Sequence, residues 1–319
     1  MGKRGIVVSI LMSLLCWAAS ADGRSMQYKP GMAADARAWQ HSVRMRLLEQ
    51  LQLADLAARH KEIGLDASVL KTETFSGYTL QELRVRSTPG RFMHVVVAKP
   101  EKIEGRLPAV VCLHGHQGTR WTPFDPKAAI YKCFGEALVN QGFIVISTDV
   151  GQHEVYESGR TLMGERLWDC IRCVDYLEGQ SDVDPKRIGC AGLSLGGEMS
   201  MWLGAMDERI SATVSAGFLT YMDQMEKNHC MCWKFDGLRE LVDFPDLYAL
   251  IAPRPLQCQN GLKEPVTQFT VPLAQKAMQE VLPAYRDLGA PENAELRVHD
   301  GAHEIDLPGL IRFFETRLK

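Results

Sequence analysis

The sequence of 319 residues has little net charge, no internal repeat and no low-complexity tract. A formal net charge of -3 gives no electrostatic reason to expect nucleic acid as a partner. Beyond residue 21, no apolar run approaches the length of a membrane-spanning helix. Because 46% of the residues are hydrophobic, the chain can build one large core, or two domains at most.

The N-terminus has the pattern of a secretory signal. Lys3 and Arg4 precede a mostly apolar run over residues 6–19, and Ala-Ser-Ala at residues 19–21 forms a small-x-small cleavage site. We therefore predict a signal peptide over residues 1–21 and a mature protein that is exported, periplasmic or secreted, with no membrane attachment after cleavage. The alternative is an uncleaved anchor.

Eight of the nine cysteines remain after residue 21. Cys170 and Cys173 lie on one face of a predicted helix, and Cys230 and Cys232 flank Met231. Four thiols allow a zinc site, but the two pairs lack the spacing of paired zinc knuckles, so we expect buried thiols instead. The sequence predicts neither disulfide pairing nor oligomeric state.

The chain after residue 70 alternates between strands and helices. An amphipathic helix over residues 33–60 predicts an N-terminal helical extension, residues 22–70, that packs on a main domain, residues 71–319. Within that domain the alternation indicates a mostly parallel sheet with helices on both faces. One excursion, residues 218–250, is expected to form a lid or a pocket wall. We predict strands over residues 78–87, 91–100, 143–148, 187–193, 210–216, 255–259 and 295–298, and one more in the apolar run of residues 107–116. Helices are expected over 128–140, 162–177, 195–205, 272–288 and 307–318.

The segment Gly192-Leu193-Ser194-Leu195-Gly196 matches the G-x-S-x-G pattern. It follows a predicted strand and precedes a predicted helix, which is the context of a nucleophile elbow. The glycines suit the tight turn, because a Cβ at either position would crowd its neighbours. Ser194 is therefore the candidate nucleophile, and the Leu195 N–H is a candidate donor to an oxyanion.

A serine nucleophile needs a base and an acid, which follow it in this order along chains with such an elbow. His303 lies in a Gly-containing loop between the last strand and the last helix, so it is the candidate base. Glu264 follows the preceding strand and is the candidate acid, with Asp223 as the alternative.

The loop His114-Gly115-His116-Gln117-Gly118 should supply a second oxyanion donor. We assign that role to the backbone N–H of His116. The two histidines also raise the possibility of a metal site, but no third ligand lies nearby in sequence, so we predict neither a metal nor a cofactor.

Several segments together resemble the bacterial α/β-hydrolase family related to dienelactone hydrolases and acetyl xylan esterases. They are "LHGHQG", "TDVGQHE", "DCIRCVDYLEGQSDVDPKRIGCAGLSLGG", "NHCMCW" and "DLYALIAPRPLQCQNG". The resemblance implies an eight-stranded α/β-hydrolase sheet and a serine esterase with no cofactor. It places the nucleophile, base and acid at Ser194, His303 and Glu264, although Asp is the commoner acid in this family.

The resemblance further implies a small-molecule or polysaccharide ester as substrate, with acetyl groups on carbohydrate favoured. A methyl esterase acting on uronic acids, a serine peptidase on the same fold and a non-catalytic glycan-binding relative stay open as alternatives. Trp121 and Trp233 are candidates to stack on sugar rings, or else packing residues. Arg160 is a candidate to bind a uronate carboxylate, or else a solvated arginine.

Overall fold

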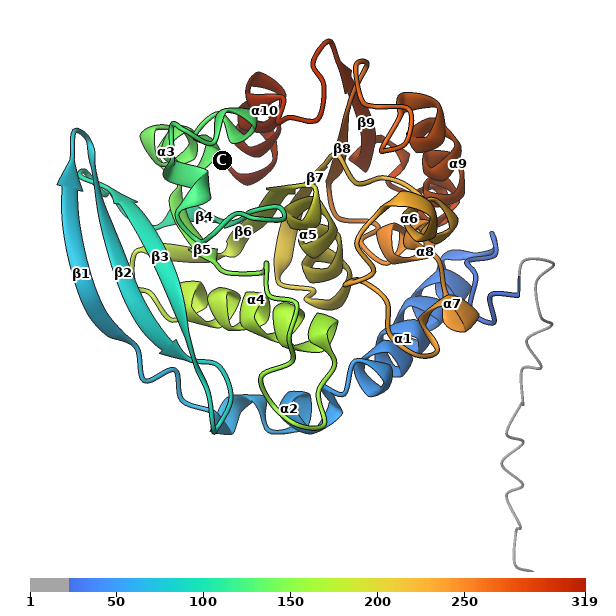
Figure 1. Ribbon diagram of the computed structural model, residues 1–319, viewed down its shortest axis with the longest axis horizontal. Helices are drawn as coiled ribbons and strands as arrows, with labels where there is room; N and C mark the ends of the chain where they lie inside the picture. Colours follow the sequence, from blue (N-terminus) through green and yellow to red (C-terminus); the bar gives the residue numbers. More distant parts are fainter. Residues whose placement is uncertain (1–22) are drawn as a thin grey trace, which may run out of the picture.

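The computed structural model describes residues 23–319, so the predicted signal peptide lies outside the described residues. Within residues 23–319, no helix combines the length and the apolar character needed to cross a membrane. The described chain forms a central sheet flanked by helices (Figure 1). Its strands are β1 (Ser68–Phe75), β2 (Tyr78–Arg86), β3 (Phe92–Pro100), β4 (Leu107–Leu113), β5 (Ile144–Thr148), β6 (Val183–Leu193), β7 (Ile210–Ala216), β8 (Leu256–Gly261) and β9 (Ala294–His299).

The sheet has the order β1-β2-β3-β5-β4-β6-β7-β8-β9. Strands β4 to β9 pair in parallel, whereas β1, β2 and β3 pair antiparallel with their neighbours. The predicted architecture is confirmed, but the sheet has nine strands where the resemblance implied eight. Strand β1 was missed because nearly all its side chains are exposed, so its sequence lacks the apolar alternation of a half-buried strand.

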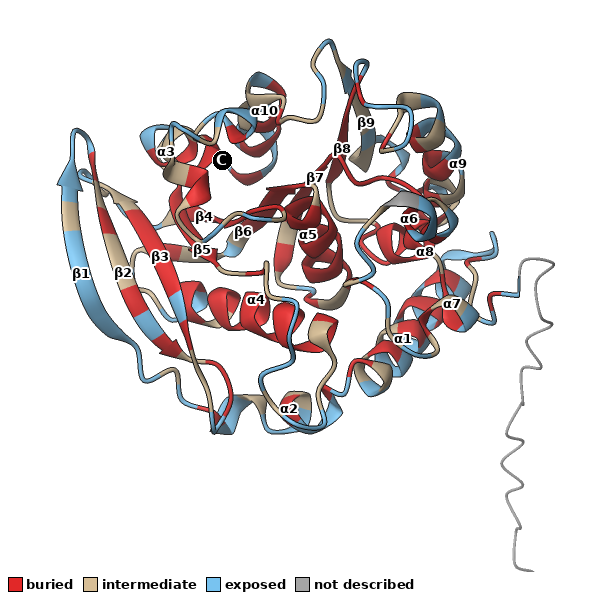
Figure 2. Ribbon diagram, viewed as in Figure 1, coloured by how far each residue is buried: buried red, intermediate tan, exposed pale blue. Residues whose placement is uncertain are grey.

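Helices cover both faces of the parallel part of the sheet. In β4, Ala109 and Val111 pack in a core with α4 (Leu162–Glu178) and α5 (Leu195–Met206). Val110 and Cys112 pack in a second core with α3 (Phe134–Asn140) and α10 (Leu307–Leu318). Burial on both faces explains the continuous apolar run of this strand, and Figure 2 shows the buried interior. The helices are α1 (Ala33–Gln50), α2 (Ala54–Ala58), α3 (Phe134–Asn140), α4 (Leu162–Glu178), α5 (Leu195–Met206), α6 (Met222–Asn228), α7 (Leu238–Leu241), α8 (Phe244–Ala249), α9 (Val271–Asp287) and α10 (Leu307–Leu318).

Two predicted helices are interrupted in the structure. The helix expected over residues 33–60 divides into α1 and α2 around Gln52, which has a φ of 58°. The helix expected over residues 128–140 starts with a short 3-10 turn, and α3 begins only after Lys132 and Cys133, both left-handed. The hydroxyl of Tyr131, in that turn, accepts a hydrogen bond of 2.7 Å from the Gly115 N–H. The irregular segment therefore supports the loop after β4.

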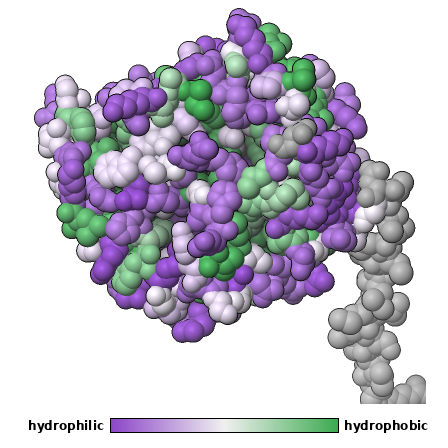
Figure 3. Space-filling model, viewed as in Figure 1, coloured by the Kyte–Doolittle hydropathy of each residue, from purple (hydrophilic) through white to green (hydrophobic). Residues whose placement is uncertain are grey.

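The N-terminal helix α1 packs closely on the main domain. Trp39, Val43 and Leu47 are buried along one face. Gln40 donates a hydrogen bond of 2.6 Å to the Ala252 carbonyl. The excursion over residues 218–250 is also well packed, since it contributes buried aromatic side chains to the main core. The face of the molecule in Figure 3 is mainly hydrophilic, with separate small apolar patches.

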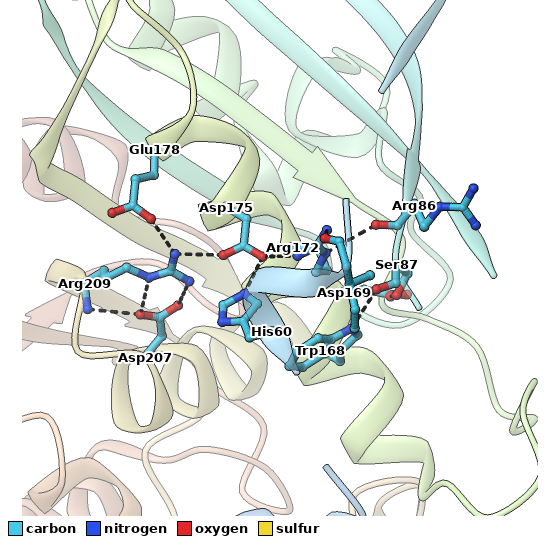
Figure 4. Close-up of polar contacts among 11 residues, drawn as sticks. His60, Arg86, Ser87, Trp168, Asp169, Arg172, Asp175, Glu178, Asp207 and Arg209 are labelled. Carbon is cyan, nitrogen blue, oxygen red and sulfur yellow. Dashed lines mark hydrogen bonds and ion pairs between the residues drawn. The ribbon is translucent and has the colours of Figure 1, made fainter. Parts of the chain in front are cut away.

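A polar network holds the segment after α2 against α4 (Figure 4). The carboxylate of Asp175, on α4, accepts hydrogen bonds of 2.6 Å from His60 Nε2, 2.6 Å from Arg172 Nη1 and 2.7 Å from Arg209 Nη1. Arg209 also donates to Asp207 at 2.6 Å. Burial raises the pKa of Asp175, but the hydrogen bond from His60 and the charge of Arg209 outweigh it, so the net shift is downward. This carboxylate is fully engaged in holding the fold together.

Candidate active site

Ser194 sits at the turn between β6 and α5. Its φ of 61° and ψ of -122° lie outside the regions that non-glycine residues usually adopt, which costs on the order of 1–3 kcal/mol. The Ser194 N–H donates a hydrogen bond of 2.9 Å to the Ala216 carbonyl, which holds the turn beside the end of β7. A Cβ on Gly192 would collide with the backbone of Gly196, and a Cβ on Gly196 would collide with the Leu113 carbonyl, so close approach requires both glycines of the motif. The turn has the conformation of a nucleophile elbow.

The structure brings His303 and Glu264 together. His303 lies between β9 and α10, and Glu264 follows β8; the distance between His303 Nδ1 and Glu264 Oε1 is 2.9 Å. The Glu264 side chain is only 1% exposed, and its Oε2 has no hydrogen-bond partner among residues 23–319. The ring of Phe269 stacks on the His303 ring with centroids 5.6 Å apart. Glu264 and Phe269 together therefore fix the orientation of the imidazole.

The His303 ring stands at the end of β7, next to the elbow. A Cβ placed on Gly217 would lie 2.8 Å from His303 Cε1, and Gly217 directly follows the Ala216 carbonyl that binds the Ser194 N–H. In the described part of the chain, Ser194 Oγ and His303 form no direct hydrogen bond. Such bonds are often long until a substrate is bound. The parallel strands thus bring three sequence-distant residues to one edge of the sheet.

Two backbone N–H groups belong to the turn at Ser194 and to the loop packed against it. Leu195 occupies the first position of α5, where the N–H has no partner within the helix. The loop after β4 packs against the elbow, because a Cβ on Gly115 would lie 3.2 Å from Ser194 Cβ. His116 follows Gly115 in this loop. Within residues 23–319, neither the Leu195 N–H nor the His116 N–H donates to a protein acceptor, so both are free to bind an oxyanion.

The other histidine of this loop has a structural role. His114 is fully buried, and its Nε2 accepts a hydrogen bond of 3.0 Å from the Val150 N–H. It therefore holds the loop after β4 against the loop after β5.

Burial controls the ionisation of two further groups beside the elbow. It lowers the pKa of His116 to about 4, with the nearby charge of Arg166 adding to the effect. Burial also raises the pKa of Glu198, in the first turn of α5, to about 8, although Arg166 opposes this shift. Burial therefore disfavours the charged form of both side chains beside Ser194.

Three residues predicted for the site lie elsewhere. Asp223 is exposed on α6 and pairs with Arg239, so the alternative acid is not at His303. Trp233 is completely buried, with its ring 5.4 Å from that of Phe244, so no sugar can stack on it.

Arg160 is also engaged away from the site. Its guanidinium donates to both carboxylate oxygens of Asp55, at 2.5 and 2.7 Å, and so ties the loop before α4 to α2. Trp121 remains partly exposed in the loop after β4, with the guanidinium of Arg120 5.9 Å from its ring. Asp223, Trp233 and Arg160 are kept from the site by ion pairing or burial. Both depend on tertiary contacts, which the local sequence does not reveal.

Two of the four thiols expected to be buried are not fully buried. Cys170 and Cys173 are buried in α4 as predicted, whereas Cys230 is exposed and Cys232 only partly buried. Both lie beside His116 and His153. The two cysteines of the motif "NHCMCW" pointed to a cluster of polar side chains here, but the histidines beside them are about 80 to 115 residues away in sequence.

Comparison with known proteins agrees with this fold. The profile of the prolyl oligopeptidase family matches residues 136–240. A structure described as a "putative acetyl xylan esterase", from Bacteroides fragilis, superposes with a TM-score of 0.71 and 19% identity, covering 88% of this chain and 79% of that one. The chain has the α/β-hydrolase fold. Methylesterase BT1017 shares this fold, with a TM-score of 0.70 and 19% identity over 94% of this chain and 71% of its own.

A curated relative gives a similar result. "Putative hydrolase YtaP" of Bacillus subtilis (strain 168) is 28% identical over 192 residues. The match covers 53% of this chain and 64% of YtaP, so the chain spans less than two thirds of that relative. The α/β-hydrolase fold places the elbow at Ser194 at the carboxyl edge of the parallel strands, where sites on open α/β sheets are found.

Proposed function

We propose that the protein is a serine hydrolase that cleaves carboxylic esters, with small acyl groups on carbohydrate as the favoured substrates. The observation that carries this proposal is the pair of His303 and Glu264 standing beside the elbow of Ser194, with Nδ1 and Oε1 2.9 Å apart. The order of these residues along the chain is the order that this fold uses. Solved structures of the same fold described as an acetyl xylan esterase, a "putative acetyl xylan esterase" and a methylesterase support the substrate class.

In the proposed mechanism, His303 Nε2 removes the proton of Ser194 as Oγ attacks the ester carbonyl. Glu264 holds the ring through Nδ1 and stabilises the imidazolium that forms. The N–H groups of Leu195 and His116 bind the oxyanion, and one such donor is typically worth about 3 kcal/mol of the barrier. His303 then protonates the leaving alcohol. Water next attacks the acyl group on Ser194, with His303 again acting as base.

The partly exposed Trp121 is the remaining candidate of the three substrate-binding residues predicted from sequence. We further propose that the protein acts after export, in the periplasm or outside the cell, because the N-terminal residues have the pattern of a signal peptide.

A peptidase is the second candidate, because the matched family profile is that of prolyl oligopeptidases. A substrate panel separates the two functions. Purified protein should hydrolyse acetylated xylo-oligosaccharides or methyl uronates much faster than prolyl peptide amides. Peptide cleavage at a comparable rate would favour the peptidase.

The first test is Ser194→Ala. We expect kcat/KM for a good ester substrate to fall by at least about 10,000-fold, because the enzyme loses its covalent step. Circular dichroism and Tm should stay close to those of the native protein. A fluorophosphonate probe should label the native protein and leave the variant unlabelled. Undiminished turnover by the variant would overturn the assignment.

A further inference from the structure

Four side chains that commonly bind metals converge beside the loop after β4. His116 comes from that loop, His153 from the loop after β5, and Cys230 and Cys232 from the segment after α6. Their ligand atoms all lie within 4.8 Å of one another. His116 Nε2 is 3.2 Å from Cys232 Sγ, and His153 Nε2 is 3.2 Å from Cys230 Sγ. Three segments that are distant in sequence therefore present two nitrogens and two sulfurs to one point.

We propose that His116, His153, Cys230 and Cys232 bind a divalent zinc ion. Two imidazoles with two thiolates are a common donor set of structural zinc sites. With Zn–N of about 2.0 Å and Zn–S of about 2.3 Å, a tetrahedral site separates nitrogen and sulfur by about 3.5 Å. The observed separations of 3.2 Å are near this value, so small movements of the side chains suffice to admit the ion.

Arg166 provides an independent reason to expect negative charge at the sulfurs. Its side chain is fully buried on α4, and among residues 23–319 no carboxylate lies within salt-bridge distance of it, although the buried carboxyl of Glu198 on α5 is close enough to interact with its charge. Its Nη1 is instead 3.4 Å from Cys232 Sγ, and it also donates to the Gln152 carbonyl. A buried cation needs an opposite charge nearby. A zinc-bound thiolate at Cys232 supplies that charge, and the Arg166 N–H groups in turn orient the ligand.

The proposed ion is structural, because four protein ligands fill a tetrahedral site and leave no position for substrate. It fastens the segment after α6 to the loop after β4, which packs against the elbow, and to the loop after β5. It also fixes the side chain of His116, whose backbone N–H is a proposed oxyanion donor. Only this last consequence rests on the proposed esterase function; the metal site itself does not.

The test is metal binding by the whole protein. Purified protein should contain about one zinc per chain by elemental analysis. After removal of zinc with a chelator, Co²⁺ should bind with the visible bands of a tetrahedral site and with thiolate-to-cobalt charge-transfer absorption. Added Zn²⁺ should abolish both signals.

Variants identify the ligands. Cys230→Ser and Cys232→Ser should each lose charge-transfer intensity, and His153→Ala should weaken Co²⁺ binding. Arg166→Met should weaken it by about 10- to 100-fold, the effect usual for a residue that orients a ligand. Cys133→Ser is the matched control, because this thiol is partly buried but lies outside the cluster, and it should bind like the native protein. Circular dichroism of each metal-free variant checks that it has folded.

Three results would each overturn the proposal: no stoichiometric metal, a cobalt spectrum without thiolate bands, or equal losses in the Cys133→Ser control. A disulfide between Cys230 and Cys232 in the native protein, found by mass spectrometry, would overturn it as well. The same measurements on Ser194→Ala should match those of the native protein. Metal binding is thus decided separately from esterase activity.

Discussion

Two of the histidine–carboxylate pairs in the described chain differ sharply in their surroundings. In one, His60 Nε2 is 2.6 Å from Asp175, whose carboxylate also binds two arginines (Figure 4). In the other, His303 Nδ1 is 2.9 Å from Glu264, whose second oxygen has no partner in the described chain. A short distance between a histidine and a carboxylate therefore does not identify a catalytic site. The useful distinction is whether the pair is held by further cations or stands beside a nucleophile.

Loss of the carboxylate charge should lower stability but not activity at Asp175, and activity but not stability at Glu264. The pair at Asp175 stabilises the fold and lies away from the elbow. The pair at Glu264 leaves one nitrogen of His303 available to move a proton. Four substitutions sharpen this comparison.

Glu264→Gln should have the largest effect. We expect kcat for ester hydrolysis to fall by about 10,000-fold, because an amide neither stabilises the imidazolium nor enforces the tautomer. The Tm should change by only a few degrees. Steady-state kinetics and thermal melts measure both quantities. Glu304→Gln, in the loop that carries His303, is the control and should keep nearly full activity; activity near the native level in Glu264→Gln would refute the role of Glu264.

Asp175→Asn should instead destabilise the protein by about 3 kcal/mol, because it leaves the buried charge of Arg172 uncompensated. The kcat of the folded variant should stay close to the native value. Chemical denaturation and activity assays test this pair of outcomes. Glu62→Gln, which removes an exposed ion pair with Arg59, should cost less than about 1 kcal/mol. Equal effects of the two variants would contradict the difference in burial.

The destabilisation caused by Asp175→Asn should depend on pH, because the pKa of Asp175 is lowered in the folded protein. The ionised carboxylate stabilises the folded state fully above its unfolded pKa, about 3.9. That stabilisation is lost as the pH falls through the lower pKa of the folded state. The difference in unfolding free energy between the native protein and Asp175→Asn should therefore be constant near pH 6 and shrink below about pH 4.

Gly217→Ala should reduce activity by about 100-fold, because the new Cβ would lie 2.8 Å from His303 Cε1 and displace the ring. Gly217 also has a φ of +59°, so the substitution adds backbone strain. Gly289→Ala separates these two causes, since its φ is +73° but no atom lies within 4 Å of the new Cβ. It should lose stability without losing kcat. If both variants lost kcat equally, displacement of the ring would not be the cause.

Arg160→Ala should have the smallest effect. Its partner Asp55 is 63% exposed, so the ion pair should contribute no more than about 1 kcal/mol to stability. Because the guanidinium binds Asp55, KM should be unchanged for both neutral acetyl esters and charged uronate esters. A selective rise in KM for the uronate esters would restore the role predicted from sequence.

The features that depend on local sequence pattern could be predicted from the sequence. The strand–turn–helix context of Ser194 and the positions of Glu264 and His303 after their strands are all visible in the order of residues. The parallel topology then brings these positions to one edge. The identity of the substrate is not contained in that pattern.

Features that depend on distant contacts could not be predicted in this way. Tryptophan often stacks on sugars, but the segment around Trp233 buries its side chain. Arg160 is paired with the carboxylate of Asp55, about 100 residues earlier in the chain. His116 and Cys232 are separated by 116 positions, so no spacing rule places them together. Such cases need the fold before their roles can be judged.

Strand β1 forms one edge of the sheet and extends beyond the covering helices (Figure 1). An uncovered edge strand is a template on which another chain can add a strand and start aggregation. Here the strand has an irregular register between Val69 and Lys71, and an ion pair joins Lys71 to Glu73. Charged side chains and interrupted pairing both discourage such addition. The solubility of the folded protein at this edge therefore depends on a few charged residues far from the candidate active site.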